Sequence, residues 1–489
     1  MQPMRGTSVV ESLLVDWVYR LPDEDVAGPP VELLDAGQVA SELARLQRNR
    51  ARETAREADL ILRLAELRPD VDDPPPGTPG ARSRTWRTTD PEFAGVSEFF
   101  PDELAHAINL GRGTAVFRAR RACTWREKLP ATFVALRRGE LDDRRAGVLA
   151  DVLQHTTAGL ATEVETALLP EAPDLSLAAL RRRALALLAA LDGAAMEERQ
   201  EEARKAADVR VADAGDGMAT LTGDLPADDA AACFAVIDSL ARMAKADGDE
   251  RPIGAIRAAI HSMLILRPAD SGCGGVHVHL AVTTTLDGLA NGEGGGEVEG
   301  APITAGQLRA LLARVGALGL STPDGGTLTF AVTDEDGRLL ATLSAGELAR
   351  LAEQGCRRHP GAECGCPVAG MPPATGSYRP TDRQHRFVDT RDRRCRMPNC
   401  GQRAGWADHD HVVPHAQGGR TTCTNLCCLC RSHHRLKTFA GGWGFRMDPD
   451  GTLHVTSPSG VTRTTRPPGL RLRGAGPPPF APADDPPPF

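Results

Sequence analysis

Six of the twelve cysteines and six of the thirteen histidines lie in one stretch between Tyr378 and Arg446. This stretch holds few large apolar side chains, so its hydrophobic core alone is too small to keep it folded. Clustered cysteine and histidine in a chain without a visible secretion signal favours a bound metal over disulfide bonds. This cluster of cysteines and histidines therefore predicts a small module in this part of the chain whose fold depends on a bound metal ion.

Four residues of the stretch have the ligand types and the spacing of a structural zinc site. Cys395 and Cys400 form one pair, and Cys430 and His433 form a second pair further along the chain. Two such pairs suit a closed tetrahedral Zn²⁺ site. One alternative stays open, in which Cys427 pairs with Cys430 and leaves His433 free.

A second group of ligand types lies upstream, in a linker rich in Gly, Pro and Cys at 355–377. These residues can form a second zinc knuckle, but closely spaced thiols in a linker are more often incidental. The group consists of Cys356, His359, Cys364 and Cys366.

Charge is distributed unevenly along the chain. The stretch from Tyr378 to Arg446 carries 13 Arg or Lys against 5 Asp and no Glu, a balance of +8. Because the whole chain carries −8, the remainder carries −16. A basic stretch on an acidic protein is typical of polyanion binding, although a solvated basic face has the same charge.

The scarcity of lysine excludes two classes of protein. Only Lys128, Lys205, Lys245 and Lys437 are present. None follows a Gly, so no phosphate-binding P-loop can form. None has an acidic residue two positions before it, which excludes nucleases of the PD…(D/E)xK type.

Asp410, His411, Asn425 and His434 form a second set, interleaved with the zinc ligands. Together with the Val-Val-Pro after His411, the Gly-Gly turn and the Cys-x2-His-His-x2-Lys segment, this set resembles the HNH family of ββα-metal nucleases. The flanking YRPTDRQHRFVDTRDRRC and GGW resemble actinobacterial HNH proteins in which a helix-rich domain of unknown function precedes the nuclease. Two further segments, LRRGELDDRRAGVLADVL and ATLTGDLPADDAAACFAVIDSLARMAKADGD, look like that domain, so the resemblance covers most of residues 30–447.

The resemblance implies a role for each of the four residues. Asp410 and His434 would offer an oxygen and a nitrogen to one catalytic divalent ion, Mg²⁺ or Mn²⁺, which neutralises charge on the phosphate. His411 points away from Asp410 along an extended segment and would act as general base on water. Asn425 would tie the loop together through backbone hydrogen bonds and orient His411 or contact the metal. His409 alternates onto the face of His411, where it suits a supporting or DNA contact.

Composition and periodicity divide the chain into six expected segments. Hairpins are expected around Asp216-Gly217 and Asp336-Gly337, and one long helix from about 175 to 206 has Asp174 as its cap. The segments are an N-terminal helical segment at 1–70, a linker at 71–90, a helix-rich domain with β-hairpins at 91–354, a linker at 355–377, an HNH nuclease module at 378–447, and a hairpin with a disordered Pro-rich tail at 448–489.

The expected fold class is a mainly α N-terminal region followed by a small zinc-stapled ββα-metal domain. The expected function is metal-dependent hydrolysis of DNA, most simply double-stranded and with weak sequence preference. The competing expectation is a non-catalytic, zinc-containing DNA-binding or scaffold protein. The longest uncharged apolar run, Ala184 to Leu191, is far shorter than the roughly 20 residues of a membrane helix. We therefore expect no membrane span and a cytoplasmic location.

Overall fold

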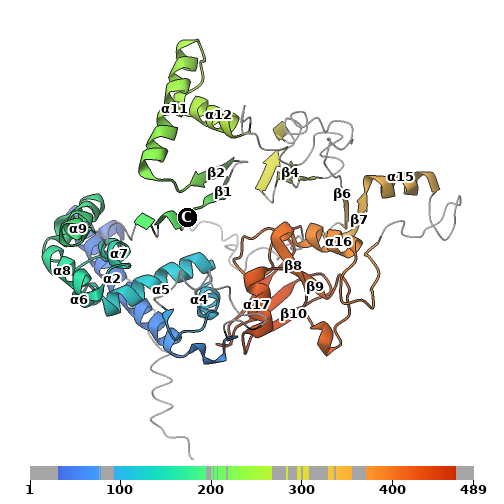
Figure 1. Cartoon of the computed structure of the whole chain (residues 1–489), viewed down its shortest axis with the longest axis horizontal. Helices are drawn as coiled ribbons and strands as arrows, with labels where there is room; N and C mark the ends of the chain where they lie inside the picture. The colour runs from blue at the N-terminus through green and yellow to red at the C-terminus, as the bar shows by residue number, and fades with distance from the viewer. Residues whose placement is uncertain are drawn as a thin grey trace, which may run out of the picture. The chain divides into compact units, whose positions relative to one another are not determined.

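The computed structural model describes residues 31–75, 78, 93–193, 200–201, 203–205, 207–215, 218–266, 282–284, 295–298, 301–304, 306–307, 329–334, 337–354 and 370–469. The chain divides into two compact units. The first comprises Met1–Leu62 and Arg120–Gly193, and the second comprises Arg63–Ala119 and Ala194–Phe489. Figure 1 shows the chain with its helices and strands labelled.

The first unit is built from helices that bury apolar faces against one another. α7 packs against α6 and α9, and α8 packs against α6 and α9. Leu136, Leu149 and Leu188 are among the fully buried side chains of this core. The helices that lie wholly or partly in the unit are α2 (Ala36–Glu66), α5 (Arg112–Glu127), α6 (Pro130–Arg138), α7 (Asp143–Leu153), α8 (Ala158–Leu168) and α9 (Leu177–Leu191).

Side-chain caps fix where several of these helices begin. Asp142, Thr157 and Ser176 each accept a hydrogen bond from a backbone N–H in the first turn of α7, α8 and α9 respectively. Such a cap satisfies a donor that has no partner inside the helix. The sequence-based expectation of Asp174 as a cap is wrong, because Asp174 lies in a preceding 3₁₀ turn and Ser176 takes the capping position.

The second unit contains the two hairpins expected from the sequence. β1 (Val209–Gly215) pairs antiparallel with β2 (Met218–Gly223), and β6 (Thr329–Thr333) pairs antiparallel with β7 (Leu339–Ser344). Gly337, in the second turn, has a φ of 76°, which favours glycine. The other elements upstream of residue 370 are η3 (Asp70–Asp72), α4 (Phe100–Ile108), α11 (Ala227–Ala246), α12 (Ile253–Leu266), β3 (Val282–Thr284), β4 (Gly295–Val298), β5 (Ala301–Thr304) and α15 (Ala345–Gln354).

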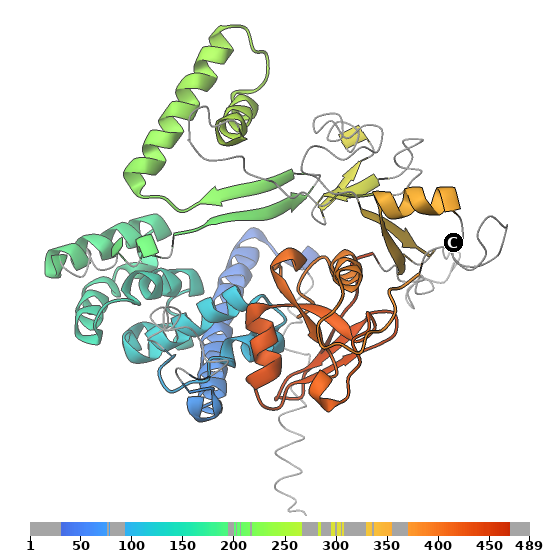
Figure 2. The ribbon, with the colours of Figure 1, turned by 45° about the vertical axis from the view of Figure 1, so that its right-hand side comes forward.

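Residues 370–469, here called the C-terminal module, contain a ββα arrangement. Strand β8 (Ala407–His411) pairs antiparallel with β9 (Leu426–Cys430), and helix α17 (Arg431–Phe439) follows directly and packs on both strands. These elements are drawn in orange and red in Figure 2. Helix α16 (Asp382–Asp392) packs on β9, and a three-stranded antiparallel sheet follows α17. The sheet consists of β10 (Gly444–Met447), β11 (Leu453–Thr456) and β12 (Thr462–Thr465).

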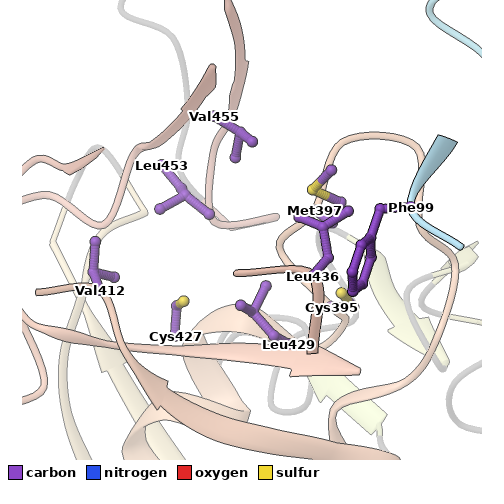
Figure 3. Packing of buried hydrophobic residues seen from close by; sticks show 9 residues of the cluster. All are labelled: Phe99, Cys395, Met397, Val412, Cys427, Leu429, Leu436, Leu453 and Val455. Carbon is purple, nitrogen blue, oxygen red and sulfur yellow. The ribbon is translucent and has the colours of Figure 1, made fainter. Parts of the chain in front are cut away.

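Strand β9 is the centre of the module because it is buried on both faces. Cys427 and Leu429 belong to one hydrophobic cluster, whereas Leu426 and Cys428 belong to a second one with Phe387. Alternate residues of a strand point to opposite faces, so a continuous apolar run is what a doubly buried strand requires. Figure 3 shows the first cluster, whose nine members are Phe99, Cys395, Met397, Val412, Cys427, Leu429, Leu436, Leu453 and Val455.

A buried ionic network joins α16 to the strands. The Asp392 carboxylate accepts hydrogen bonds from Arg391 Nε (2.7 Å), Arg396 Nη1 (2.8 Å) and the backbone N–H of Cys428 (2.9 Å). Burial acts to raise the pKa of Asp392, but the two guanidiniums outweigh it and hold the pKa below 3.8. The arginines also donate to four carbonyl groups, those of Cys423, Leu426, Gly451 and Thr465.

The expected fold class is confirmed: a helix-rich N-terminal region, small separate antiparallel sheets, and a C-terminal Cys/His cluster compatible with zinc. The expected segment boundaries stay a prediction. The hydrophobic cluster around β9 includes Leu453 and Val455 from beyond residue 447 and Phe99 from far upstream. No described helix is both long enough and apolar enough to cross a membrane.

Candidate metal centre

Cys395, Cys400, Cys430 and His433 bring one potential ligand atom each to within 4.8 Å of one another. His433 Nδ1 lies 3.1 Å from Cys430 Sγ and 3.4 Å from Cys395 Sγ. Three sulfurs and one nitrogen in so small a cluster suit a tetrahedral ion. The four predicted ligands therefore come together, and they can hold a metal ion such as zinc.

Local structure positions both pairs. Asn399, with a φ of 61°, adopts the left-handed conformation in the turn between Cys395 and Cys400. Cys430 is the N-cap residue of α17, and His433 lies in the first turn of that helix. A tight turn therefore holds Cys395 and Cys400, and the start of α17 holds Cys430 and His433.

The chemistry of the donors fits a cation. The neighbouring thiols of Cys400 and Cys430, together with burial, raise the pKa of Cys395 far above its ordinary value. Thiolates, not thiols, bind metals, so a bound divalent ion reverses this effect. Contacts with Cys395 and Cys400, and with His433, lower the pKa of Cys430, so the cluster already favours one thiolate, and a metal ion would stabilise the others.

Cys427 lies apart from this cluster of donors. It is fully buried in the hydrophobic cluster of Figure 3, where burial raises the pKa of its thiol to about 12. Cys423 is fully buried in the second cluster, and its thiol has a pKa raised to about 11, again by burial. The geometry favours His433 over Cys427 as the fourth ligand.

His409 joins a different group. His409 Nε2 lies 2.8 Å from Asp389 Oδ1, and His409 Nδ1 lies 2.8 Å from His385 Nδ1. Cys428 Sγ is 3.6 Å from the same Asp389 oxygen, so Asp389, His409 and Cys428 form a second group of potential ligands. These contacts link α16 to β8 on the side of the sheet that carries the second hydrophobic cluster.

Asp410 and His434 come together from β8 and α17. Asp410 Oδ1 lies 3.5 Å from His434 Nε2, and Asp410 Oδ2 lies 2.8 Å from Lys437 Nζ. The first distance is too long for a good hydrogen bond. Both atoms carry a free electron pair, so a carboxylate oxygen and an imidazole nitrogen are available here as ligands of one cation.

Asp408 was not predicted to belong to the site. Asp408 Oδ2 lies 2.8 Å from His434 Nδ1. Because this contact engages Nδ1, the other ring nitrogen, Nε2, remains facing Asp410. A carboxylate on the far nitrogen of a ligating histidine is a common support of metal sites. The sequence did hold a signal for it, because Asp408 and Asp410 alternate onto one face of the strand.

His411 lies on the opposite side of β8 from Asp410 and is buried. Its Nε2 is 2.8 Å from Thr421 Oγ1, and that hydroxyl donates its proton to the Ser377 carbonyl at 2.7 Å. The hydroxyl therefore accepts from His411 Nε2–H, which leaves a lone pair on Nδ1. Burial lowers the pKa of His411, so the ring is neutral at pH 7. The Tyr378 ring stacks on it with the centroids 5.4 Å apart.

Asn425 ties together the loop between β8 and β9, as predicted. Its amide donates to the carbonyls of Val413 (3.1 Å) and Arg420 (3.0 Å) and accepts from the Val413 N–H (2.9 Å). These bonds run to loop backbone, and no direct hydrogen bond joins Asn425 to His411 among the described contacts. Gly419 fits closely here, because a Cβ on it would lie 1.9 Å from the Val413 carbonyl oxygen.

The possible second knuckle of Cys356, His359, Cys364 and Cys366 lies outside the described residues.

Comparison with known proteins identifies a family for the larger part of the chain. "Domain of unknown function (DUF222)" matches residues 40–328. The uncharacterised protein Rv3776 of Mycobacterium tuberculosis is 48% identical over 90 residues, which is 18% of this chain and 17% of that protein. The uncharacterised protein Rv2100 of the same organism is 44% identical over 115 residues, 24% of this chain and 19% of that protein. The matches thus span less than a fifth of these relatives' length, and no solved structure matches the chain.

Proposed function

The chain belongs to the DUF222 family, whose function is unknown, and we propose that its C-terminal module is a metal-dependent HNH endonuclease acting on DNA. The observation that carries the proposal is the pair of Asp410 and His434, a carboxylate oxygen on a strand and an imidazole nitrogen on a helix 3.5 Å apart. His411 follows Asp410 directly in the sequence. The two proposed ligands of the cation and a neutral histidine that can act as a base therefore belong to the same ββα unit.

Zinc has a structural role in this proposal. Cys395, Cys400, Cys430 and His433 would hold the ion with four protein ligands, the number that a structural zinc site uses. The ion would join the loop after α16 to the start of α17. The helix then carries structural ligands in its first turn and His434, the next residue, toward the catalytic side.

The catalytic ion, Mg²⁺ or Mn²⁺, would be held by Asp410 and His434 and would supply charge neutralisation at the phosphate. Asp408 orients the His434 ring through the hydrogen bond to Nδ1. Lys437 sets a positive charge beside Asp410 and also donates to the His411 carbonyl at 2.6 Å. The lysine therefore holds the two adjacent catalytic residues in register with the helix.

His411 acts as the general base through Nδ1. Thr421 accepts the Nε2 proton, so the ring is in the tautomer that can take a proton from water at Nδ1. Its lowered pKa keeps it unprotonated at neutral pH. DNA is the proposed substrate because the basic balance of the module suits a polyanion.

The full chain, mixed with supercoiled plasmid and Mg²⁺ or Mn²⁺, should convert it to nicked circles. His411→Ala should lower the nicking rate by about 10²–10⁴-fold and leave DNA binding unchanged. His415→Ala is the matched control, because its ring lies 5.6 Å from that of His411 but has no proposed catalytic role. An equal loss in both variants would mean that the packing of the rings, and not a base, supports cleavage.

The competing function is a zinc-containing DNA-binding or scaffold protein without catalysis. It predicts plasmid binding without nicking in either ion, and the same assay decides between the two.

A further inference from the structure

The metal centre has a neighbour from the family-matched part of the sequence. Phe99 precedes α4 and is buried in the cluster of Figure 3, beside Cys395 and Leu436. Phe99 and α4 lie in the second compact unit together with the C-terminal module, and both fall within the DUF222 match at 40–328. A segment almost 300 positions upstream thus completes the core beside the metal ligands.

Polar contacts fix the same segment at several points. Arg435 Nη2 and Nη1 donate to the two Glu98 oxygens at 2.8 and 2.9 Å, and both side chains are at most 15% exposed. His106 Nε2 lies 3.0 Å from the Val461 carbonyl oxygen, and Asn399 donates to Asn109 at 3.0 Å. Because these contacts lie at both ends of α4, they hold the whole helix beside the hydrophobic cluster of Figure 3.

The contact closest to the metal ligands is that of Asp102 with His433. Asp102 Oδ1 lies 3.2 Å from His433 Nε2 and 3.1 Å from Arg112 Nε, and its side chain is 2% exposed. Neither contact has the angles of a good hydrogen bond, so this buried oxygen retains unused acceptor capacity. The other ring nitrogen of His433 faces the thiols of Cys395 and Cys430. The imidazole is therefore placed between a thiol cluster and a carboxylate.

We infer that Asp102 is a positioning residue of the metal centre, the carboxylate that orients His433 from outside the C-terminal module. A ligating histidine normally donates its second N–H to such an acceptor, which fixes the ring and increases its basicity. The DUF222 segment then governs how firmly the centre holds its ion. The inference rests on the zinc role proposed above, but not on nuclease activity.

A simpler role for Asp102 is to pair with Arg112 and to stabilise α4. Glu103, the next residue, provides the comparison. Its side chain is 3% exposed and pairs with Arg68 at 2.6 Å, but it makes no described contact with a metal ligand. Loss of either acid removes a buried charge from the same helix, and only the loss of Asp102 should affect the metal.

The test measures zinc affinity of the full chain by competition with a chelator. Asp102→Asn should weaken zinc binding by about 10–100-fold, whereas Glu103→Gln should leave it within about twofold of the unaltered chain. Equal weakening in the two variants would show that Asp102 acts through the stability of α4, and unchanged affinity in Asp102→Asn would overturn the inference directly.

The same substitution in a second variant of the chain separates a lost contact with His433 from a folding defect. In His433→Cys the fourth ligand is a thiolate, which suits zinc and needs no carboxylate partner. Adding Asp102→Asn to that background should therefore cost no further affinity. If it costs the same factor as in the unaltered chain, Asp102 does not act through the imidazole. Absence of zinc from the unaltered chain would remove the proposed centre and this inference together, whereas absence of nicking with intact zinc would remove only the nuclease.

Discussion

At the scale of single residues, the imidazoles of His411 and His434 are both oriented by a partner on one ring nitrogen. Asp408 contacts His434 Nδ1, and Thr421 contacts His411 Nε2, both at 2.8 Å. The partner decides which nitrogen is available for chemistry. Residue types and spacing predicted the histidines themselves, but Thr421 was not predicted, because its role depends on a loop that returns to the end of β8.

Thr421 can be tested through its hydroxyl. Thr421→Val removes the acceptor of the His411 Nε2 proton and should lower the nicking rate by about 3–10-fold, the equivalent of one hydrogen bond. Thr421→Ser keeps the hydroxyl and is the matched control. The measurement is the nicking rate of each variant at saturating plasmid. Equal rates for Thr421→Val and Thr421→Ser would show that Thr421 does not set which nitrogen of His411 acts as the base.

Asp392 should be the most costly single residue to replace in the buried network. Asp392→Asn leaves Arg391 and Arg396 buried without a counter-charge, which typically costs about 3–5 kcal/mol. The measurement is the free energy of unfolding of the full chain by denaturant, followed at the C-terminal module. Asp382→Asn, an exposed change at the start of the same helix, should cost less than about 0.5 kcal/mol.

The pH dependence of that network has a defined sign. The pKa of Asp392 is held below 3.8, so its contribution to stability is complete above the ordinary pKa. The contribution should be lost only as the pH falls through the lowered value. In Asp392→Asn this acid-induced loss should be smaller than in the unaltered chain, and an equally large loss would contradict the assignment to Asp392.

At the scale of elements, periodicity was a good guide where an element is long or has a strong turn signal. The N-terminal segment at 1–70, expected to be helical, contains α2 at Ala36–Glu66, and the two expected hairpins correspond to β1 with β2 and β6 with β7. The sheet β10–β12 was only partly foreseen, as a hairpin after 448. Its strands have four residues each, too few for alternation to stand out from the surrounding turns.

The loop between β8 and β9 should be intolerant of a side chain at Gly419. Gly419→Ala brings a Cβ to 1.9 Å from the Val413 carbonyl oxygen, so the backbone that Asn425 holds must move. We expect a loss of nicking of at least about 10-fold while zinc content stays unchanged, because the loop lies apart from the zinc ligands. Gly401→Ala, where a Cβ meets nothing within 4 Å, is the control. Full activity in Gly419→Ala would show that the loop relaxes without consequence.

At the scale of the whole molecule, local sequence patterns do not reveal which distant segments share a core. The four candidate metal ligands could be predicted because all four lie within a short part of the chain. Phe99 and Asp102 could not, because their partners lie more than 290 positions later and neither residue belongs to a motif. Composition placed a boundary between a helix-rich region and a nuclease module, whereas packing joins part of the first to the second.

A fragment cut at the predicted boundaries should therefore be unstable. Residues 378–447 lack Phe99, Leu453 and Val455 of the first cluster, and burial of each such side chain contributes about 1.5–3 kcal/mol. The combined loss is comparable with the whole stability of a small domain, about 5–15 kcal/mol. Thermal unfolding should rank the full chain above 370–469, and 370–469 above 378–447. A cooperative, zinc-loaded fragment of 378–447 would disprove this account of the core.

DNA binding should draw on fewer arginines than the charge balance suggests. Arg391 and Arg396 are 7% and 2% exposed within the Asp392 network, so they cannot reach a phosphate.

Arg420 is exposed at the end of the loop that Asn425 holds, next to Thr421. If it contacts a phosphate, Arg420→Gln should reduce the slope of log affinity against log salt by about 0.9, equally for unrelated DNA sequences. The control is Arg242→Gln on α11, where the side chain is 73% exposed and the slope should not change. Titrations without divalent ion separate binding from cleavage, and an equal change in both variants would mean that the helix-rich region contacts DNA as well.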